Sequence, residues 1–483
     1  MKKIVTSLIF APAILALVNV ARAAQDTEGF VRVSEDGRGF TLNGEPWHPF
    51  GCNYFDPHVG WAPKLWQKFD ARRVESHFRA MRDLGVNVVR VFLTAQSFFP
   101  QPPNLEAEAL EKFDAMLTVA RRYGIRLHPT GPDHWEGQPA WRRTDFLADP
   151  QALEAQVAFW KAFAARYRDE PFIFAYDLLN EPHVRWNTAA IKAQWPLWLC
   201  EKYGTLTALR KAWGEEGKNV ESFKQVEAPA DVPAPRSRAL LDYQRFRESL
   251  ADRWVKLQVE AIRAADPNHL VTVGLIQWTV PVHYGKPSRY AAFRPSRIAP
   301  MLDFISVHFY PLYGGDPLAS SQNLNKNLAY LELVLRYVKA GAPRKPLFVG
   351  EFGWHGGGRP DHLQEWPAED QVRWCRAAVL QGRGIAAGWL NWAYADTPSS
   401  RDVTKFSGLV TEDGKPKPWG LAFRKLAANP LLWTRDAPEP TAKVVLDVDR
   451  AIVDPKAGDA MLKRYYEAWK VEKRCALIIR SHR

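Results

Sequence analysis

The sequence predicts an α/β protein built as a (β/α)8 barrel, the TIM-barrel fold. Short apolar runs rich in β-branched and aromatic residues alternate with amphipathic helical patterns, which is typical of parallel β-α units. Eight such runs recur at intervals of roughly 40 residues, and eight parallel strands are the number that closes this barrel. The structural alternative is an open doubly wound sheet, which a G-x-G-x-x-G turn after the first strand would support. The stretch "GCNYFDPHVG" (51–60) contains no such turn.

Each predicted strand is a short apolar run bounded by helical or turn segments. In chain order they are "FGCNY" (50–54), "VNVVRVFL" (86–93), "IRLHPT" (125–130), "FIFAYDLLN" (172–180), "LVTVGLI" (270–276), "DFISVHFY" (303–310), "PLFVGEF" (346–352) and "AAGWLNW" (386–392). Their near-continuous apolar character implies burial on both faces. Between them, helical stripes place apolar residues on one face, as in Val74, Phe78, Met81 and Leu84.

The chain divides into a leader, a barrel domain and a short extension. Residues 1–23 have a basic start, an apolar middle and an Ala21-Arg22-Ala23 ending, the order of a secretory signal peptide. We therefore expect export to the periplasm or the extracellular space. Residues 29–430 contain all eight strand runs and form the predicted barrel domain. The extension at 431–483 is too small for an independent core, so we expect it to pack on the barrel.

An insertion interrupts the barrel pattern between the fourth and fifth strands. The connection there is more than twice the length that a β-α unit needs, and its excess lies at 185–235. This segment contains four tryptophans and the proline-rich "APADVPAP" (228–235); the tryptophans are Trp186, Trp195, Trp198 and Trp213. Because it leaves from the end of a strand, we expect it to cover part of the active-site face and to contribute at least one tryptophan to the cleft.

Charge and cysteine content exclude several classes of partner. The net charge is +12, and loss of Lys2, Lys3 and Arg22 with the leader leaves +9. Lys and Arg alternate with acids along the helices and form no long block, so we expect no nucleic acid, although anionic cell-wall or matrix material remains an option. Beyond the leader, no segment is apolar enough for a membrane span. The cysteines, which are Cys52, Cys200, Cys375 and Cys475, have no metal-binding spacing, and their pairing stays open.

Polar residues end several of the predicted strands, where a barrel places its active site. They are Arg90, His128, Asn180, Glu181, His308, Tyr310, Glu351 and Trp392. Each alone has an ordinary structural explanation, such as an ion pair, a core histidine or barrel packing. Their joint occurrence at strand ends favours a functional site.

Two of these residues are carboxylates on strands four and seven, across the mouth of one barrel. Retaining glycoside hydrolysis requires such a pair, about 5 to 5.5 Å apart, because one carboxyl protonates the leaving oxygen while the other attacks the anomeric carbon. Arg90 and Tyr310 would hold Glu351 ionised through a nearby cation and a hydrogen bond. The pKa of Glu181 is expected to be raised, since like charges in one site move the two values apart.

The remaining polar residues suit supporting roles in sugar binding. Asn180 would bind a sugar 2-hydroxyl, His308 would hydrogen-bond Glu181 or the substrate, and Trp392 would stack on a sugar face. Tryptophan makes up 20 of 483 residues. Further candidates for stacking fall in loops or after strand ends; they are Trp135, Trp141, Trp195, Trp198, Trp278, Trp354 and Trp366.

These motifs resemble glycoside hydrolase family 5 and its wider clan of barrel glycosidases. The resemblance covers roughly 29–430 and rests on "VVRVF", "YDLLNEP", "SVHFYP", "VGEFGW" and "GWLNWAY". It implies that Glu181 is the acid/base and Glu351 the nucleophile. It also implies substrate or carboxylate contacts for the strand-end residues Arg90, Asn180, His308, Tyr310 and Trp392.

Two features depart from the pattern of that family. The family usually places a histidine at the end of strand three, and here His128 and His134 both qualify, with His128 preferred. The stretch "EKYGTLTALRKAWG" (201–214) resembles a segment of exo-acting β-galactosidases of the same clan. It keeps exo action open.

The function that the sequence predicts is retaining hydrolysis of a β-1,4-linked polysaccharide by double displacement. Mannan is favoured over glucan, as in a mannan endo-1,4-β-mannosidase or a cellulase. The alternatives are an exo-acting β-mannosidase or β-galactosidase, and a non-catalytic carbohydrate-binding barrel. The partner is then an oligo- or polysaccharide, and neither metal nor organic cofactor is implied, because the chemistry needs only two carboxyls and water. The sugar, the linkage and the oligomeric state stay open.

Overall fold

The barrel predicted from the eight apolar runs is present and closed. The computed structural model describes residues 29–60, 62–133, 137–143, 145–282, 285–311, 321–353, 367–400, 402–434 and 439–481. Eight parallel strands pair in the order β10–β11–β4–β5–β6–β7–β8–β9, so the last barrel strand in the chain, β11, pairs with the first, β4. The strands are Phe50–Asn53 (β4), Val88–Thr94 (β5), Arg126–Asp133 (β6), Ala175–Asn180 (β7), Leu270–Leu275 (β8), Ile305–Phe309 (β9), Leu347–Phe352 (β10) and Gly388–Asn391 (β11). Each overlaps one predicted run, which confirms the fold class.

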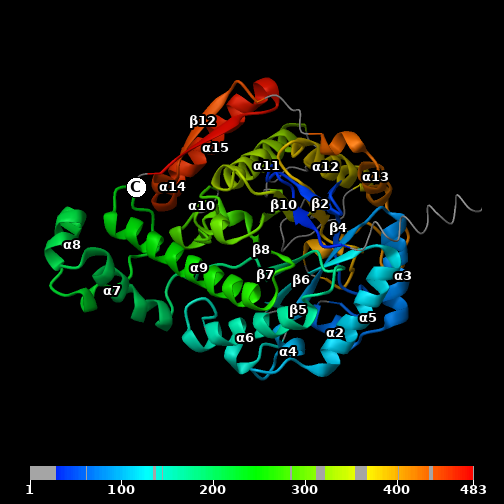
Figure 1. The fold of residues 1–483 in the computed structure, drawn as a ribbon. Coiled ribbons are helices and arrows are strands. Elements are labelled where there is room, and N and C mark those ends of the chain that lie inside the picture. Colours follow the sequence, from blue (N-terminus) through cyan, green and yellow to red (C-terminus); the bar gives the residue numbers. More distant parts are fainter. Residues whose placement is uncertain are drawn as a thin grey trace, which may run out of the picture.

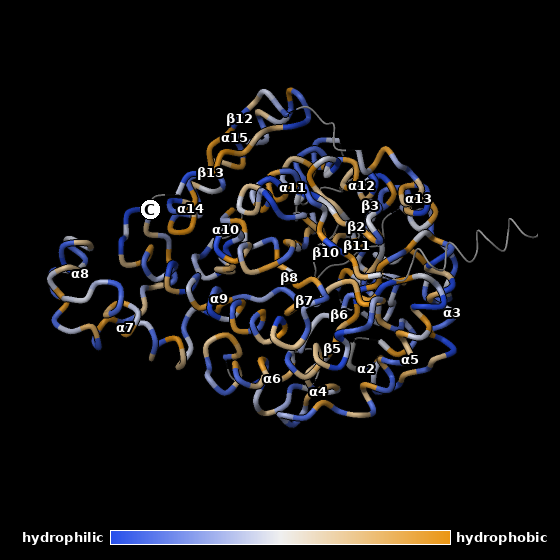
Figure 2. The backbone as a smooth tube through the Cα atoms, viewed as in Figure 1, coloured by the Kyte–Doolittle hydropathy of each residue, from blue (hydrophilic) through white to orange (hydrophobic). Residues whose placement is uncertain are grey.

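Helices surround the strands, as Figure 1 shows. They are α2 (Ala62–Gln67), α3 (Ala71–Asp83), α4 (Ala95–Phe98), α5 (Ala107–Tyr123), α6 (Pro150–Tyr167), α9 (Arg238–Ala265), α10 (Pro295–Ile298), α11 (Ser321–Gly341), α12 (Ala368–Gln381) and α13 (Pro418–Ala427). Local signals fix their ends. The Asp70 carboxylate caps α3 by accepting two backbone N–H groups, and α5 ends at Gly124, whose φ of 67° favours glycine. Figure 2 shows hydrophobic residues concentrated in the strands, with hydrophilic residues along the outer helices.

An antiparallel hairpin and an aromatic cluster close the N-terminal end of the barrel. The hairpin strands are Arg32–Val33 (β1), Phe40–Leu42 (β2) and Glu45–Trp47 (β3). Phe40 on β2 packs edge-on against Phe174 and Phe304, with ring centroids 5.3 and 5.2 Å apart. Phe348 joins the same buried cluster from the start of β10. With this end filled by aromatic rings, polar chemistry is confined to the opposite, C-terminal end of the strands.

The insertion after β7 forms two helices, α7 (Ala189–Tyr203) and α8 (Leu206–Trp213), that pack beside α9. Figure 1 shows both at the edge of the molecule, on the far side of α9 from the strands. The Trp195 ring is buried and stacks on Trp198 and Trp213, with centroids 5.6 and 6.4 Å apart. Trp186 packs edge-on against Tyr243 of α9. The structure gives these tryptophans a packing role, and the expectation that one of them lines the cleft finds no support in it.

The C-terminal extension packs on the outside of α11. Its strands β12 (Lys443–Asp447) and β13 (Ala476–Arg480) pair in parallel and are connected by α14 (Val448–Val453) and α15 (Pro455–Glu472). The buried Glu332 carboxylate of α11 accepts hydrogen bonds from the Trp469 indole and from the backbone N–H of Cys475, both 3.1 Å long. All four cysteines are free thiols. In the part of the chain that the structure describes, no helix is long and apolar enough to cross a membrane.

Candidate active site

The structure brings most of the predicted strand-end residues together at the C-terminal mouth of the barrel. Glu351 lies near the end of β10 opposite His308 of β9, and Glu181 follows the last residue of β7. The two glutamates differ in exposure: the side chain of Glu181 is 28% exposed and that of Glu351 only 5%. The more accessible carboxyl can meet water and a leaving group, while the enclosed one can face the bound sugar.

The distance between the carboxyls fits the retaining geometry. One carboxylate oxygen of Glu181, one of Glu351 and an imidazole nitrogen of His308 all lie within 4.8 Å of one another. Retaining enzymes place their carboxyl groups about 5 to 5.5 Å apart, and inverting enzymes about 6.5 to 9.5 Å. Oxygen atoms this close match the shorter, retaining spacing, which favours direct attack on the anomeric carbon over attack by an interposed water.

Glu351 accepts hydrogen bonds from Arg90 of β5 and from Tyr310, which directly follows β9. Arg90 Nη1 donates to Oε1 at 2.7 Å, and the Tyr310 hydroxyl donates to Oε2 at 2.8 Å. Burial raises the pKa of Glu351 above its ordinary value, and the charge of Glu181 adds to this. His308, Arg90 and the Tyr310 hydroxyl oppose the rise. Arg90 and Tyr310 act in the expected direction, but burial has the largest effect on the pKa of Glu351, and these donors only offset it.

Arg90 is the centre of a buried hydrogen-bond network that sequence reasoning found only in part. Its guanidinium also donates to Asp177, Asn180 and Asn53, at distances between 2.7 and 3.0 Å. Asp177 and Asn53 were not predicted. The available signal was an acid within the apolar run "FIFAYDLLN" (172–180) and an amide within "FGCNY" (50–54), since buried polar groups need partners.

Glycines make the close packing of this network possible. A Cβ atom on Gly274 of β8 would lie 2.9 Å from both Arg90 Nη2 and His308 Nε2, closer than side chains tolerate. On Gly350 of β10 it would lie 2.5 Å from the Ser306 hydroxyl. The absence of side chains at these two positions allows the charged groups to approach one another across the barrel.

The backbone at Glu181 is strained. Its φ of 48° lies in the left-handed region, which costs a non-glycine residue about 1 kcal/mol or more. Its N–H donates to the carbonyl of Gly274 at 2.8 Å, which helps to hold that conformation. The strand ends in Asn180-Glu181-Pro182, where the chain bends sharply and directs the Glu181 carboxyl toward the barrel mouth.

His308 lies against both carboxyls as a neutral imidazole. Its Nδ1 is 3.0 Å from Glu181 Oε1 and 3.3 Å from Glu351 Oε1. Burial and the nearby Arg90 lower the pKa of His308 to about 4, although Glu351 and Asp177 act in the opposite direction. At neutral pH it is therefore uncharged, and it acts on Glu181 by a hydrogen bond.

His128 does not lie at the mouth, contrary to the prediction. It is fully buried inside the barrel, where its ring packs among Phe174, Phe304 and Phe348 of the aromatic cluster. Its Nδ1 lies 2.7 Å from the carbonyl of Ala175, and burial lowers its pKa to about 4. The residue belongs to β6, in register with Arg90 of β5, and its ring is fully buried within the aromatic cluster, so it offers no exposed surface to a substrate. The competing candidate, His134, lies outside the described residues.

Trp392 lies at the mouth but is almost covered. It is 4% exposed and packs against Phe55 and Phe92, with its indole N–H donating to Thr404 at 3.0 Å. Only a small part of the ring can meet a sugar. Of the other tryptophans expected to stack, Trp135, Trp354 and Trp366 lie outside the described residues.

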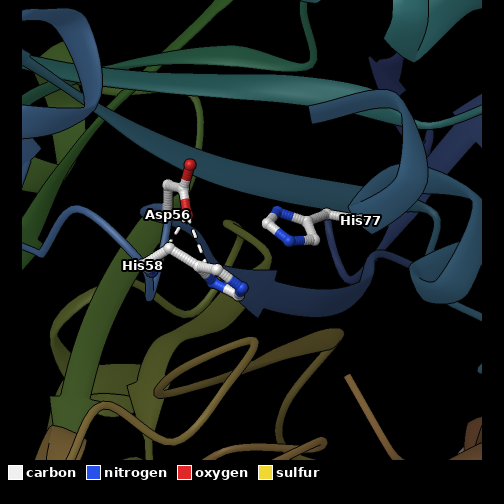
Figure 3. A group of neighbouring side chains, drawn as sticks. All are labelled: Asp56, His58 and His77. Carbon is white, nitrogen blue, oxygen red and sulfur yellow. Dashed lines mark hydrogen bonds and ion pairs between the residues drawn. The ribbon is translucent and has the colours of Figure 1, made fainter. Parts of the chain in front are cut away.

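A second group, formed by Asp56, His58 and His77 after β4 and on α3, has the composition of a transition-metal site (Figure 3). One ligand atom of each lies within 4.8 Å of the others. The Asp56 carboxylate is, however, paired with Arg73 at 2.7 Å, and His77 Nδ1 lies 3.0 Å from the Tyr54 hydroxyl. The arginine cancels the charge that would attract a divalent cation. We therefore interpret this group as a structural turn.

Comparisons with known proteins lead to one clan of enzymes. The family model for β-galactosidases of glycosyl hydrolase family 42 matches residues 128–352. The β-galactosidase of Thermus thermophilus is 28% identical over 369 residues, which cover 70% of this chain and 52% of that protein. A probable mannan endo-1,4-β-mannosidase A-1 of Aspergillus terreus is 25% identical over 187 residues, 34% of this chain and 46% of that protein. This chain thus spans about half the length of these curated relatives.

A solved structure extends the likeness of the fold to nearly the whole chain. The exo-β-1,4-mannosidase of an Opitutaceae bacterium, strain TAV5, has a TM-score of 0.64 at 17% identity, covering 92% of this chain and 72% of that one. The chain thus shares the barrel fold of this mannosidase, and the relatives that it matches are a β-galactosidase and a probable mannan endo-1,4-β-mannosidase. In sequence and fold the chain is similar to the (β/α)8-barrel glycoside hydrolases of families 5 and 42, and its motifs are like those of family 5.

Proposed function

We propose that this protein hydrolyses β-glycosides with retention of configuration, using Glu351 as nucleophile and Glu181 as acid and base. The observation that carries the proposal is the carboxyl pair with atoms within 4.8 Å across the barrel mouth. Their different surroundings support the division of roles. Glu351 is enclosed and accepts from Arg90 and Tyr310, which suits an anion, whereas Glu181 is partly exposed beside a neutral histidine.

The reaction takes two steps. A Glu351 oxygen attacks the anomeric carbon as the glycosidic C–O bond breaks, and Glu181 gives its proton to the leaving oxygen. Glu181, now a carboxylate, then takes a proton from water, whose oxygen displaces Glu351 and restores the original configuration. The Asn180 carbonyl oxygen is occupied by Arg90, so its amide nitrogen remains to donate to the sugar 2-hydroxyl.

For the substrate, we propose a β-1,4-linked mannose-containing saccharide, with β-galactosides as the second candidate. The mannosidase structure and the mannanase relative support the first, and the family 42 match and the Thermus relative support the second. Incubation with mannan, cellulose, xylan, β-1,4-manno-oligosaccharides and nitrophenyl β-glycosides would separate these. Release of monosaccharide from the ends of the polysaccharide indicates exo action, and mixed oligosaccharides indicate endo action. A protein that binds these saccharides without cleaving them would be a carbohydrate-binding barrel.

Replacing each carboxyl in turn tests the roles. Glu181→Ala should lose about 100-fold or more in kcat/KM on substrates with poor leaving groups, because these need the proton, and far less on activated aryl glycosides. Azide should then restore turnover and give the β-glycosyl azide. Glu351→Ala should be inactive on every substrate, and any azide product should be the α anomer.

A matched control is Glu248→Ala, which removes a buried carboxylate that pairs with Arg245 on α9, away from the mouth. It should lower stability without any response to azide. The opposite pattern in the two site variants would reverse the roles, and near-normal rates in both would place the chemistry elsewhere.

We also propose that the protein is exported, on the strength of the leader-like residues 1–23, which lie outside the described part of the structure.

A further inference from the structure

Every donor of the Arg90 guanidinium is used, and Asp177 uses two of the five. Nε and Nη2 both donate to Asp177 Oδ2, at 2.9 and 2.7 Å. The other three N–H groups go to Asn180, Asn53 and Glu351. An arginine with all donors engaged cannot rotate without breaking several charge-assisted bonds. Its orientation toward Glu351 is therefore set mainly by Asp177, the acceptor with the most bonds.

Asp177 is itself fixed from two further strands. The Thr130 hydroxyl of β6 donates to its Oδ2 at 2.9 Å, and the backbone N–H of Gly274 on β8 donates to Oδ1 at 2.7 Å. The side chain is fully buried, and it has no contact with solvent through which a substrate could reach it. A buried carboxylate with this many hydrogen-bond partners is held in one position.

Arg90 carries one positive charge but lies between two carboxylates, so Glu351 does not receive its full stabilising effect. One cation lies between two carboxylates, at 2.7 Å from each, so its stabilising effect on Glu351 is divided with Asp177. Among the residues that the structure describes, the titratable groups that face Glu351 are Arg90 from β5, Glu181 after β7, His308 from β9 and Tyr310 after β9. Those that face Asp177 are Arg90, His128 and His308.

We propose that Asp177 is a positioning residue that orients Arg90 and limits how strongly Arg90 stabilises the Glu351 carboxylate. This inference rests on the proposed role of Glu351 as nucleophile. A carboxylate that is stabilised too strongly ionises readily but attacks poorly, because nucleophilicity falls with basicity. Asp177 thus keeps Glu351 basic enough to react while Arg90 holds it in place.

The test uses Asp177→Asn, which keeps the shape and removes the charge. With the full charge of Arg90 available, Glu351 should ionise at lower pH, so the acidic limb of the kcat/KM profile should move down by about one pH unit. The kcat should fall about tenfold or more, with KM changed less than about threefold, because the defect lies in the reacting carboxyl. Asp177→Glu, which keeps the charge, should leave the acidic limb near its original position.

The nucleophile can be followed directly with a 2-deoxy-2-fluoro glycoside, which traps the glycosyl-enzyme. In the unaltered protein this reagent should label Glu351; if it labels another residue or none, the proposed function fails. If it labels Glu351 but the pH dependence of labelling is the same in Asp177→Asn, only the present inference fails.

Two further variants guard against a general loss of structure. Asp242→Asn alters another buried aspartate, which accepts from Trp213 at the base of the insertion, and should lower the melting temperature without moving the acidic limb. A shift of the limb in this control would overturn the inference. Should Asp177→Asn not fold, Thr130→Val gives the decisive result: without the hydroxyl donor Asp177 competes harder for Arg90, so the limb should move upward by a few tenths of a pH unit. An unchanged or lowered limb would overturn the proposal.

Discussion

Glu351 lies where the proposed reaction takes place, but its burial makes the charged form of the carboxyl unfavourable. Burial raises its pKa, so the ionised form that the proposed reaction needs is disfavoured by the fold. Arg90 and Tyr310 reduce this penalty without removing it. A residue whose chemistry requires such a compromise lowers the stability of the whole protein, which is a frequent property of catalytic groups.

Replacing Glu351 with glutamine should therefore stabilise the protein at neutral pH. A carboxyl whose folded pKa is raised destabilises the fold above that pKa and has no such effect below its unfolded value of about 4.3. We expect the melting temperature of Glu351→Gln to exceed that of the unaltered protein by about 1–3 °C at pH 7. The difference should shrink as the pH falls toward 4 and vanish below it. A variant that melts lower at pH 7 would show that the pairing with Arg90 outweighs burial.

At the scale of elements, the insertion after β7 is a small helical unit that stabilises itself against α9. Its core is the stack of Trp195, Trp198 and Trp213, which is closed by Tyr243 at 5.1 Å from Trp195. The Asp242 carboxylate adds a hydrogen bond from the Trp213 indole at 2.8 Å. These contacts fasten the insertion to the side of the barrel domain and bury Trp195 and Trp213, while Trp186 and Trp198 are half-buried.

Trp195→Leu should thus affect stability and not catalysis. Loss of the buried indole should cost about 3 kcal/mol in the unfolding free energy, as for other large-to-small changes in cores. The kcat/KM on an aryl glycoside should stay within about twofold. Chemical denaturation and steady-state kinetics check both, and Trp198→Leu, at a half-buried position, should cost less. A tenfold loss of activity at unchanged stability would restore Trp195 to the cleft.

The whole molecule is a barrel with an insertion on one side and a C-terminal extension on another. Glu332 of α11 accepts hydrogen bonds from the Trp469 indole and from the backbone N–H of Cys475. These bonds join the extension to the outer helices of the barrel. The net charge of the full sequence is +12, and it would be +9 without residues 1–23, as in the exported form proposed above. A positive net charge would favour contact with anionic material.

Export is checked by the N-terminus of the protein recovered outside the cytoplasm. We expect cleavage after Ala23, so that sequencing begins at Ala24 and the intact mass lacks residues 1–23. Ala23→Arg should block cleavage, because signal peptidase sites require a small residue there. Full-length protein that remains in the cytoplasm in both forms would contradict the proposal.

The sequence alone determined the barrel, its eight strands and the two candidate carboxyls. It could do so because strand and helix patterns are local, with periods that each segment shows by itself, and because a strand end in a barrel has one possible location. Arg90, Asn180, His308 and Tyr310 followed from the same rule.

Only the tertiary structure decided which side chains share a network and which merely end a strand. His128 looked like a site residue because it ends a run, but the barrel turns its ring into the aromatic cluster. Asp177 looked like part of an apolar strand, yet it meets Arg90, Thr130 and Gly274 from three other strands. The stagger of neighbouring strands decides whether a side chain points inward, how deep in the barrel it lies and how much space a glycine leaves beside it. That stagger is a property of the closed sheet, which no single segment encodes.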